Sequence, residues 1–307
     1  DPKLFSLADD HVHHNLKETL LSMLDQLERC QKALAEFLEE KRDAFSRFYF
    51  IGDDDLLEIL GQAKNPAVIQ SHLKKLFQGI NKVQFNDSKT QIVAMVSSLG
   101  EVVPLEPVTT TDKVEEWLTL LADEMKASLT AQLSKCYSLR VKNSADFDYE
   151  SFPSQVLDKA DRIRFATDAE AALRGGGARA LADLLASLRE LLEVYTSFDL
   201  TRHPVMQSKV KALILDLVHH MDVVQYLEKA RCADVDDWAW HKQLRYYMAD
   251  DGTCKLMMCD ATFDYTYEYQ GNAPKLVHTP LTDKCYLTLT QGMHMGFGGN
   301  PYGPAGT

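Results

Sequence analysis

Apolar residues recur at helical spacing over most of the first 230 residues, and this pattern limits the chain to a mainly helical fold. In residues 12–45 charged residues separate the leucines, which is typical of an amphipathic helix packed on neighbouring elements. The heptad is neither strict nor long enough for a coiled-coil dimer. We expect further long helices over residues 112–129, 153–173, 179–195 and 208–230. The leucines of the first helix are Leu16, Leu20, Leu24, Leu27, Leu34 and Leu38.

Shorter elements follow the first helix. The aromatic run 48–51 predicts a strand, and the acidic run 53–55 predicts a helix start, where carboxylates cap free N–H groups and face the positive end of the helix dipole. Three adjacent acids could also ligate a metal, but an acidic run without further ligands is more typical of a cap. This helix is expected to end at Gly61, and Asn65-Pro66 to start another that ends at Gly79.

Two regions carry strand patterns. Extended runs at 82–85, 91–96 and 101–105, separated by turn residues, predict a small antiparallel meander. Aromatic residues alternate with polar ones over 262–270, which predicts a half-buried strand. We place a domain boundary there, giving a helical region over 1–261 and a second region over 262–307. The glycine run 175–177 predicts a break between helices and not a phosphate loop, because it lacks a lysine and a preceding strand.

Composition excludes some classes of protein. The net charge of −12 argues against a nucleic-acid or anionic-membrane binder, which needs a basic face. No apolar run is long enough to span a membrane. Six cysteines without metal-binding spacing predict reduced, mostly buried thiols. The three tryptophans are candidates for docking anchors, although core positions are more typical of such residues: Trp117, Trp238 and Trp240.

The last residues of the sequence carry a chemical signal. A phosphate-binding loop needs glycines whose backbone N–H groups can face phosphate oxygens, then a lysine and a hydroxyl residue that binds Mg²⁺. The final five residues match the front of such a loop, whereas the closing Gly-Lys-Ser/Thr is not in the sequence. A glycine- and proline-rich end is by itself more typical of a flexible tail. The five residues are Gly303, Pro304, Ala305, Gly306 and Thr307.

Four blocks upstream resemble segments of dynein heavy chains, and they occur along this chain in the same order as in that family. They make the loop credible. Trp-Ala-Trp-His-Lys-Gln-Leu-Arg (238–245) is similar to the end of the dynein linker, and residues 265–291 are similar to the start of the first AAA+ module. Residues 47–62 and 100–118 are similar to earlier linker segments. The blocks at 267–277 and 298–307 look most like the cytoplasmic dynein of intraflagellar transport, with axonemal dyneins as the alternative. The alanine- and glycine-rich stretch 169–182 departs from the family pattern.

The resemblance implies a mainly α fold: an elongated helical-bundle linker with small antiparallel β-hairpin insertions, leading into the start of an α/β AAA+ P-loop module. It implies an ATPase motor that uses ATP with Mg²⁺, in which the linker couples ATP binding and hydrolysis to a stroke toward the microtubule minus end. The five loop residues would form the front of the phosphate cradle, and Pro280, Leu281 and Thr282 would lie near the adenine.

The implied partners are the rest of the AAA+ ring, microtubules through a stalk, intermediate and light chains, and intraflagellar transport particles. The implied location is cytoplasm, cytoskeleton and cilium. By itself the chain is expected not to hydrolyse ATP, because the lysine, the hydroxyl, an acid pair and an arginine of the next module are needed. A non-enzymatic helical scaffold and a different P-loop ATPase are the other hypotheses, although the 238–245 block argues against the latter.

Overall fold

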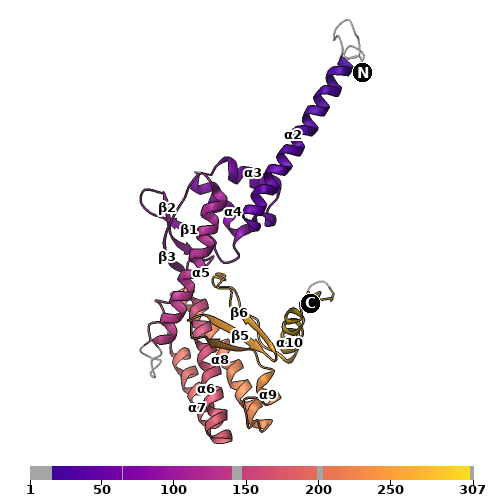
Figure 1. Cartoon of the computed structure of the whole chain (residues 1–307). Helices are drawn as coiled ribbons and strands as arrows, with labels where there is room; N and C mark the ends of the chain where they lie inside the picture. Colours follow the sequence, from indigo (N-terminus) through magenta and orange to yellow (C-terminus); the bar gives the residue numbers. More distant parts are fainter. Residues whose placement is uncertain (1–15, 64, 140–146, 199–202, 305–307) are drawn as a thin grey trace. The chain divides into compact units, whose positions relative to one another are not determined.

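The computed structural model describes residues 16–63, 65–139, 147–198 and 203–304 (Figure 1). Its residues divide into two compact units. The first unit consists of the chain up to Leu76 together with Thr111–Thr119, and the second consists of Phe77–Thr110 and the chain from Leu120 onward. The fold is mainly helical with small antiparallel β elements, as the sequence predicts, and these elements form two three-stranded sheets. In the described ranges no helix combines the length and apolar character that crossing a membrane requires.

In the first unit, helix α2 (Leu16–Ala44) confirms the predicted long helix. The prediction that its apolar face packs on neighbours is wrong over most of its length. Leu20, Leu24 and Leu27 are each more than half exposed, whereas Leu38 near the C-terminal end is 2% exposed. The buried end is the part that contacts η1 (Ser46–Phe50). An amphipathic pattern predicts a helix locally, but burial needs a second element.

The strand predicted over 48–51 is also wrong, because this segment is the 3₁₀ helix η1. Phe45, Phe48 and Ile51 are buried, whereas Tyr49 and Phe50 are exposed. Phe48 N–H donates to the Phe45 carbonyl at 3.0 Å, and Ile51 N–H to the Phe48 carbonyl at 3.2 Å. Burial therefore recurs every three residues, which is the 3₁₀ period. The packing of these three side chains thus outweighs the β propensity of the aromatic residues.

Helices α3 (Asp53–Gly61) and α4 (Pro66–Leu76) follow and pack against each other. The predicted end at Gly61 and start at Pro66 are confirmed, although α4 ends before Gly79. The acids at 53–55 occupy the first turn of α3, but the N-cap is Gly52 and makes no side-chain cap hydrogen bond. Two of the carboxylates instead form ion pairs of 2.6 Å each, Asp53 with Arg42 and Asp55 with Lys75.

The second unit begins with the predicted meander, which is confirmed. Strands β1 (Lys82–Phe85), β2 (Gln91–Val96) and β3 (Val102–Thr109) form an antiparallel sheet in the order β1-β2-β3. Strand β3 runs further than predicted and contains two prolines. Proline has no N–H to donate, and an edge strand tolerates this because only one of its sides pairs with a neighbouring strand. Helix α5 (Val114–Ser138) follows, with its first six residues in the first unit.

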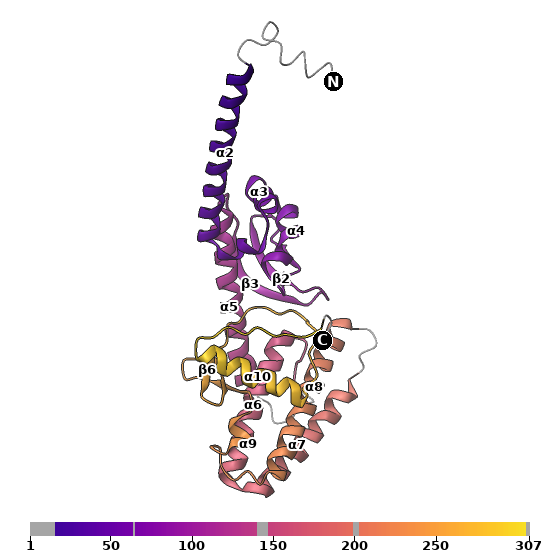
Figure 2. The same cartoon turned by 90° about the vertical axis from the view of Figure 1, so that its right-hand side faces the viewer.

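Three helices form the main bundle of the second unit: α6 (Ser154–Gly175), α7 (Gly177–Ser197) and α8 (Pro204–Lys229). They run alongside one another (Figure 2). The predicted glycine break separates α6 from α7. After α9 (Trp238–His241), strands β4 (Arg245–Met248), β5 (Cys254–Met258) and β6 (Ala261–Asp264) form the second sheet, and β4 packs on α6. Helix α10 (Pro280–His294) contacts β5 and β6.

The strand predicted over 262–270 ends at Asp264. Tyr267 has a φ of +52°, a backbone conformation that a continuous strand does not allow. The predicted domain boundary between 261 and 262 falls inside β6. Trp117 and Trp240 are each 1% exposed and belong to the core, whereas Trp238 is 60% exposed. All six cysteines are free thiols, and four are buried.

Candidate functional site

The residues predicted to contact ATP lie at two places in the second unit. Pro280, Leu281 and Thr282 form the first turn of α10, where the Thr279 hydroxyl accepts a 3.3 Å hydrogen bond from the Thr282 N–H. Gly303 and Pro304 are exposed and outside regular structure. The other three predicted loop residues, 305–307, lie outside the described residues. The sequence does carry a signal for α10, because threonine as N-cap followed by proline is typical of a helix start.

The start of α10 presents an apolar surface. Leu276, Val277 and Leu281 are 76%, 64% and 70% exposed. Aliphatic side chains of this kind suit the face of an adenine ring. On the phosphate side Gly303 offers a backbone N–H group, and no cation stands between Gly303 and the last residue. The described residues thus offer an aliphatic surface for a base and one backbone N–H group for a phosphate, and residues 303–307 include no cation to balance the phosphate charge.

The chain reaches α10 through residues 265–278, which we call the junction segment. Gln155 at the start of α6 makes the hydrogen bonds to the junction segment that a neighbouring strand would otherwise make. Its amide nitrogen donates to the Tyr265 hydroxyl at 2.5 Å and to the Glu268 carbonyl at 2.8 Å, and its amide oxygen accepts from the Gln270 N–H at 2.8 Å. Gln155 is 6% exposed, so these hydrogen bonds do not compete with bulk water. The junction segment is thereby held along α6 without a sheet.

A second anchor holds the middle of the junction segment to the first sheet of this unit. Tyr269 donates its hydroxyl proton to Glu101 at 2.8 Å, and both side chains are buried. The other carboxylate oxygen of Glu101 accepts from the Ser154 N–H at 2.8 Å and lies 3.6 Å from the Lys209 ammonium. Nearby, the Ser97 hydroxyl donates to Asn272 at 2.6 Å. Glu101 thus ties the junction segment to α6 and α8.

Burial shapes the ionisation of this anchor. It raises the pKa of the Tyr269 hydroxyl well above its usual range, and the neighbouring Glu101 carboxylate adds to the rise. Burial also lowers the pKa of Lys209, although Glu101 opposes that change. Tyr269 therefore stays a neutral donor, which is the form that the hydrogen bond needs.

The third anchor is an ion cluster at Lys275. Its ammonium contacts two carboxylates, Asp158 on α6 and Asp216 on α8. Each of these aspartates is 3% exposed. Arg162 also bridges them, with contacts of 3.2 Å to Asp158 and 2.7 Å to Asp216. Lys159 adds a further contact to Asp158. One residue of the junction segment thus completes a buried cluster between two helices.

The two carboxylates of the cluster differ in ionisation. Burial pushes the pKa of Asp158 upward, but Lys159, Arg162 and Lys275 together hold it well below its usual value. The pKa of Asp216 is raised to about 6, chiefly by burial and then by its hydrogen bond with Asp158, while Arg162 opposes the rise. Asp158 therefore stays ionised, whereas the ionisation of Asp216 depends more on Arg162 and Lys275, the two cations that both carboxylates contact.

The last anchor is a stack of two imidazoles. The rings of His278 and His219 on α8 lie 3.8 Å apart and nearly parallel, and Tyr286 on α10 meets the His278 ring edge-on at 5.7 Å. Burial lowers the pKa of His219 to about 3, with His278 and Arg162 adding repulsion. Burial likewise lowers the pKa of His278. Two neutral rings stack without charge repulsion, and they fix the start of α10 to α8.

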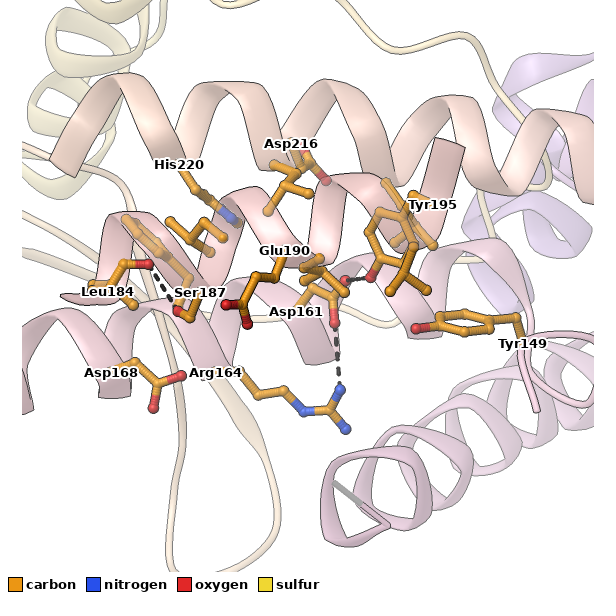
Figure 3. A pocket seen from close by; sticks show the side chains of 16 residues that line it. Tyr149, Asp161, Arg164, Asp168, Leu184, Ser187, Glu190, Tyr195, Asp216 and His220 are labelled. Atoms are coloured by element: carbon orange, nitrogen blue, oxygen red, sulfur yellow. Dashed lines mark hydrogen bonds and ion pairs between the residues drawn. The ribbon is translucent and has the colours of Figure 1, made fainter. Parts of the chain in front are cut away.

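A hollow of about 640 Å³ lies beside this cluster, between α6, α7 and α8 (Figure 3). Inside it the Tyr195 hydroxyl donates to Asp161 at 2.8 Å, and Arg164 approaches the same carboxylate at 3.4 Å. Burial raises the pKa of Asp161. Asp216 lines the hollow and also binds Lys275, so the wall of the hollow and the ion cluster share one residue.

Comparison with known proteins agrees with the sequence blocks. The family model "Dynein heavy chain, N-terminal region 2" matches residues 2–136, and "Hydrolytic ATP binding site of dynein motor region" matches residues 265–307. The cytoplasmic dynein 2 heavy chain 1 of Rattus norvegicus is 54% identical over 304 residues, covering 96% of this chain and 7% of that protein. The chain belongs to the dynein heavy-chain family.

The relatives differ in their identity to this chain. The cytoplasmic dynein 2 heavy chain 1 of Tripneustes gratilla is 56% identical over 303 residues, covering 95% of this chain and 7% of that protein. The cytoplasmic dynein heavy chain of Dictyostelium discoideum is 37% identical over 318 residues, covering 95% of this chain and again 7% of that protein. This dynein chain is thus more similar to the dynein 2 heavy chains, and it spans about 7% of the length of these curated relatives.

The anchors lie in the two regions that the dynein family models match. The junction segment of this dynein chain is the beginning of the part matched by the ATP-binding model. Glu101 and Ser97 lie in the part matched by the N-terminal model. Their hydrogen bonds to Tyr269 and Asn272 therefore join the two dynein regions directly. Sequence reasoning missed these anchors, because a lone Glu or Gln in a helical pattern gives no signal of its partner.

Proposed function

We propose that this chain acts as a lever in an ATP-driven microtubule motor, and that the junction segment carries changes at the ATP site to helices α6 and α8. The observation that carries the proposal is the set of anchors on one short segment. Lys275 contacts both helices, and Gln155 and Glu101 hold the residues before it. A segment held by buried ionic and hydrogen-bonded contacts transmits displacement instead of absorbing it.

The ATP site is proposed from the same segment. Gly303, Pro304, Ala305, Gly306 and Thr307 would form the front of the cradle for the phosphates of ATP, which Mg²⁺ accompanies. Pro280, Leu281 and Thr282 would lie near the adenine, where Leu281 offers an exposed aliphatic surface. Bound ATP would supply free energy by hydrolysis, while the residues of this chain position it.

The chain by itself is proposed to be inactive, because the catalytic lysine, the acid pair and the arginine of the next module are not among its 307 residues. We expect no phosphate release above background when the purified chain is mixed with ATP and Mg²⁺. Turnover that Gly306→Val abolishes would contradict this proposal.

In the cell we propose a minus-end-directed motor for retrograde intraflagellar transport, located in cytoplasm, cytoskeleton and cilium. Its partners would be the rest of the AAA+ ring, microtubules, intermediate and light chains, and intraflagellar transport particles. Support comes from 50–56% identity to proteins named cytoplasmic dynein 2 heavy chain 1. An axonemal dynein that drives ciliary beating and a non-enzymatic scaffold are the alternatives.

One experiment separates these functions. Full-length heavy chain, wild type or Gly306→Val, is tested for microtubule-stimulated ATP hydrolysis and for microtubule gliding. We expect the wild type to be active in both assays and Gly306→Val in neither, because a side chain there would occupy the space of a phosphate. The matched control Gly298→Ala should behave as wild type, since a Cβ at Gly298 meets nothing within 4 Å. A scaffold predicts no ATP-dependent gliding, and confinement of the tagged protein to axonemal arms would favour the axonemal alternative.

A further inference from the structure

A buried histidine stands between two carboxylates where α3 and α4 pack in the first unit. His72 on α4 is 5% exposed. Its Nε2 lies 3.1 Å from the Glu58 carboxylate, and its Nδ1 lies 3.6 Å from the Asp55 carboxylate. Asp55 and Glu58 are one helical turn apart on α3, so both face α4. One ligand atom from each of the three residues can be chosen so that all lie within 4.8 Å of one another.

The hydrogen-bonding capacity of the imidazole leaves one side of this arrangement incomplete. A neutral ring has one donor and one acceptor nitrogen. If Nε2 donates to Glu58, Nδ1 is an acceptor, and it faces another acceptor, an Asp55 oxygen. Nδ1 is buried and has no hydrogen-bond partner among the described residues. Two acceptors that face each other repel unless a proton or a metal ion lies between them.

The gap between these atoms suits a metal ion. Zinc binds imidazole nitrogen and carboxylate oxygen at about 2.0–2.2 Å, so two tetrahedral ligands lie about 3.3–3.6 Å apart. The observed separation of Nδ1 and the Asp55 oxygen is 3.6 Å. Lys75 does not block this oxygen, because its ammonium contacts the other oxygen of Asp55 at 2.6 Å.

We propose that the Asp55 carboxylate and Nδ1 of His72 bind a divalent transition-metal ion, with Zn²⁺ as the preferred ion, while the Glu58 carboxylate accepts from Nε2–H and fixes the imidazole ring. An imidazole ligand favours zinc over the hard cations Mg²⁺ and Ca²⁺, which select oxygen ligands. Two carboxylates and the single cation Lys75 leave one negative charge to attract the metal ion. The Asp55 side chain is 31% exposed, so water can fill the remaining positions around the ion. Bound metal ties α3 to α4.

The test is a zinc titration of the 307-residue chain by calorimetry. Other ligands are removed first, since His11, His13 and His14 lie close together in the sequence outside the described residues, and Cys30 and Cys285 are exposed thiols. With these histidines changed to alanine and the two cysteines to serine, we expect one saturable zinc site per chain. Cobalt in place of zinc should give the visible absorption of a tetrahedral site.

Variants assign the site to its residues. Asp55→Asn and Glu58→Gln keep the shape of each side chain and should each weaken zinc binding at least about tenfold, as losses at metal sites commonly do. Asp54→Asn, in the same turn of α3 but outside the cluster, should bind as the parent does. Circular dichroism confirms that each variant is folded. Unchanged affinity in both Asp55→Asn and Glu58→Gln, or no saturable binding in the parent, would overturn the proposal in favour of a proton between His72 and Asp55.

Discussion

The Tyr269 hydroxyl donates a 2.8 Å hydrogen bond to the Glu101 carboxylate across 168 positions of sequence. Glu101 lies in the part matched by the dynein N-terminal model, and Tyr269 in the part matched by the ATP-binding model. The bond is buried, and the same carboxylate receives the first N–H of α6. This contact between two buried side chains therefore holds the junction segment together with the anchors at Gln155, Lys275 and His278.

Removing the Tyr269 hydroxyl should destabilise the chain. In Tyr269→Phe the Glu101 carboxylate loses a donor while staying buried, which typically costs about 1.5–3 kcal/mol. Urea unfolding followed by circular dichroism measures the change in the free energy of unfolding. Tyr302→Phe is the control, because Tyr302 is 91% exposed. Equal stability of Tyr269→Phe and wild type would show that the bond does not anchor the junction segment.

Gly79 is predicted to be intolerant of any side chain. A Cβ at this position would lie 2.1 Å from the Tyr269 carbonyl oxygen and 2.7 Å from the Gly271 nitrogen, both backbone atoms that cannot rotate away. Gly79→Ala should therefore lower the free energy of unfolding by about 1–3 kcal/mol or more. Gly61→Ala is the matched control, since a Cβ there meets nothing within 4 Å. Thermal denaturation that shifts equally in both variants would contradict the close approach.

His219 should make the chain sensitive to acid. Its pKa falls from the usual 6.5 to about 3 on folding, so the unfolded state binds the proton more readily. The stability that depends on neutral His219 is complete above about pH 6.5 and is lost as the pH falls toward 3. His219→Gln should lose less stability than wild type between about pH 7 and 4.5 in urea titrations. His294→Gln, at the exposed end of α10, should follow wild type, and parallel curves for His219→Gln and wild type would refute the assignment.

Local patterns predicted the helices of this chain, because apolar spacing acts within a few residues. The segment predicted as a strand over 48–51 is η1, because Phe45, Phe48 and Ile51, spaced three residues apart, are buried together. Composition does not reveal this packing. The strand over 262–270 stopped at Asp264 because Gln155, more than a hundred residues earlier, supplies the hydrogen bonds of a missing strand. The ATP-site residues were proposed through family resemblance, whereas Glu101 and Lys275 required three-dimensional contacts.

The central claim is that Lys275 couples the ATP-binding region to α6 and α8. Lys275→Met leaves Asp158 and Asp216 with fewer cations, and the loss of one partner of a buried pair commonly costs about 3–5 kcal/mol. Lys275→Arg keeps the charge, so it is the matched control for changing the side chain without removing the cation. Both variants are compared with wild type as full-length heavy chain, with folding checked by circular dichroism.

The most direct measurement records ATP hydrolysis and microtubule gliding velocity in the same preparations. We expect Lys275→Met to hydrolyse ATP at a rate close to that of wild type while gliding at least about tenfold more slowly, a change of about 1.4 kcal/mol in coupling. Lys275→Arg should retain most of the velocity. Equal velocities for Lys275→Met and wild type, or a loss of velocity that follows the loss of hydrolysis in proportion, would contradict the account.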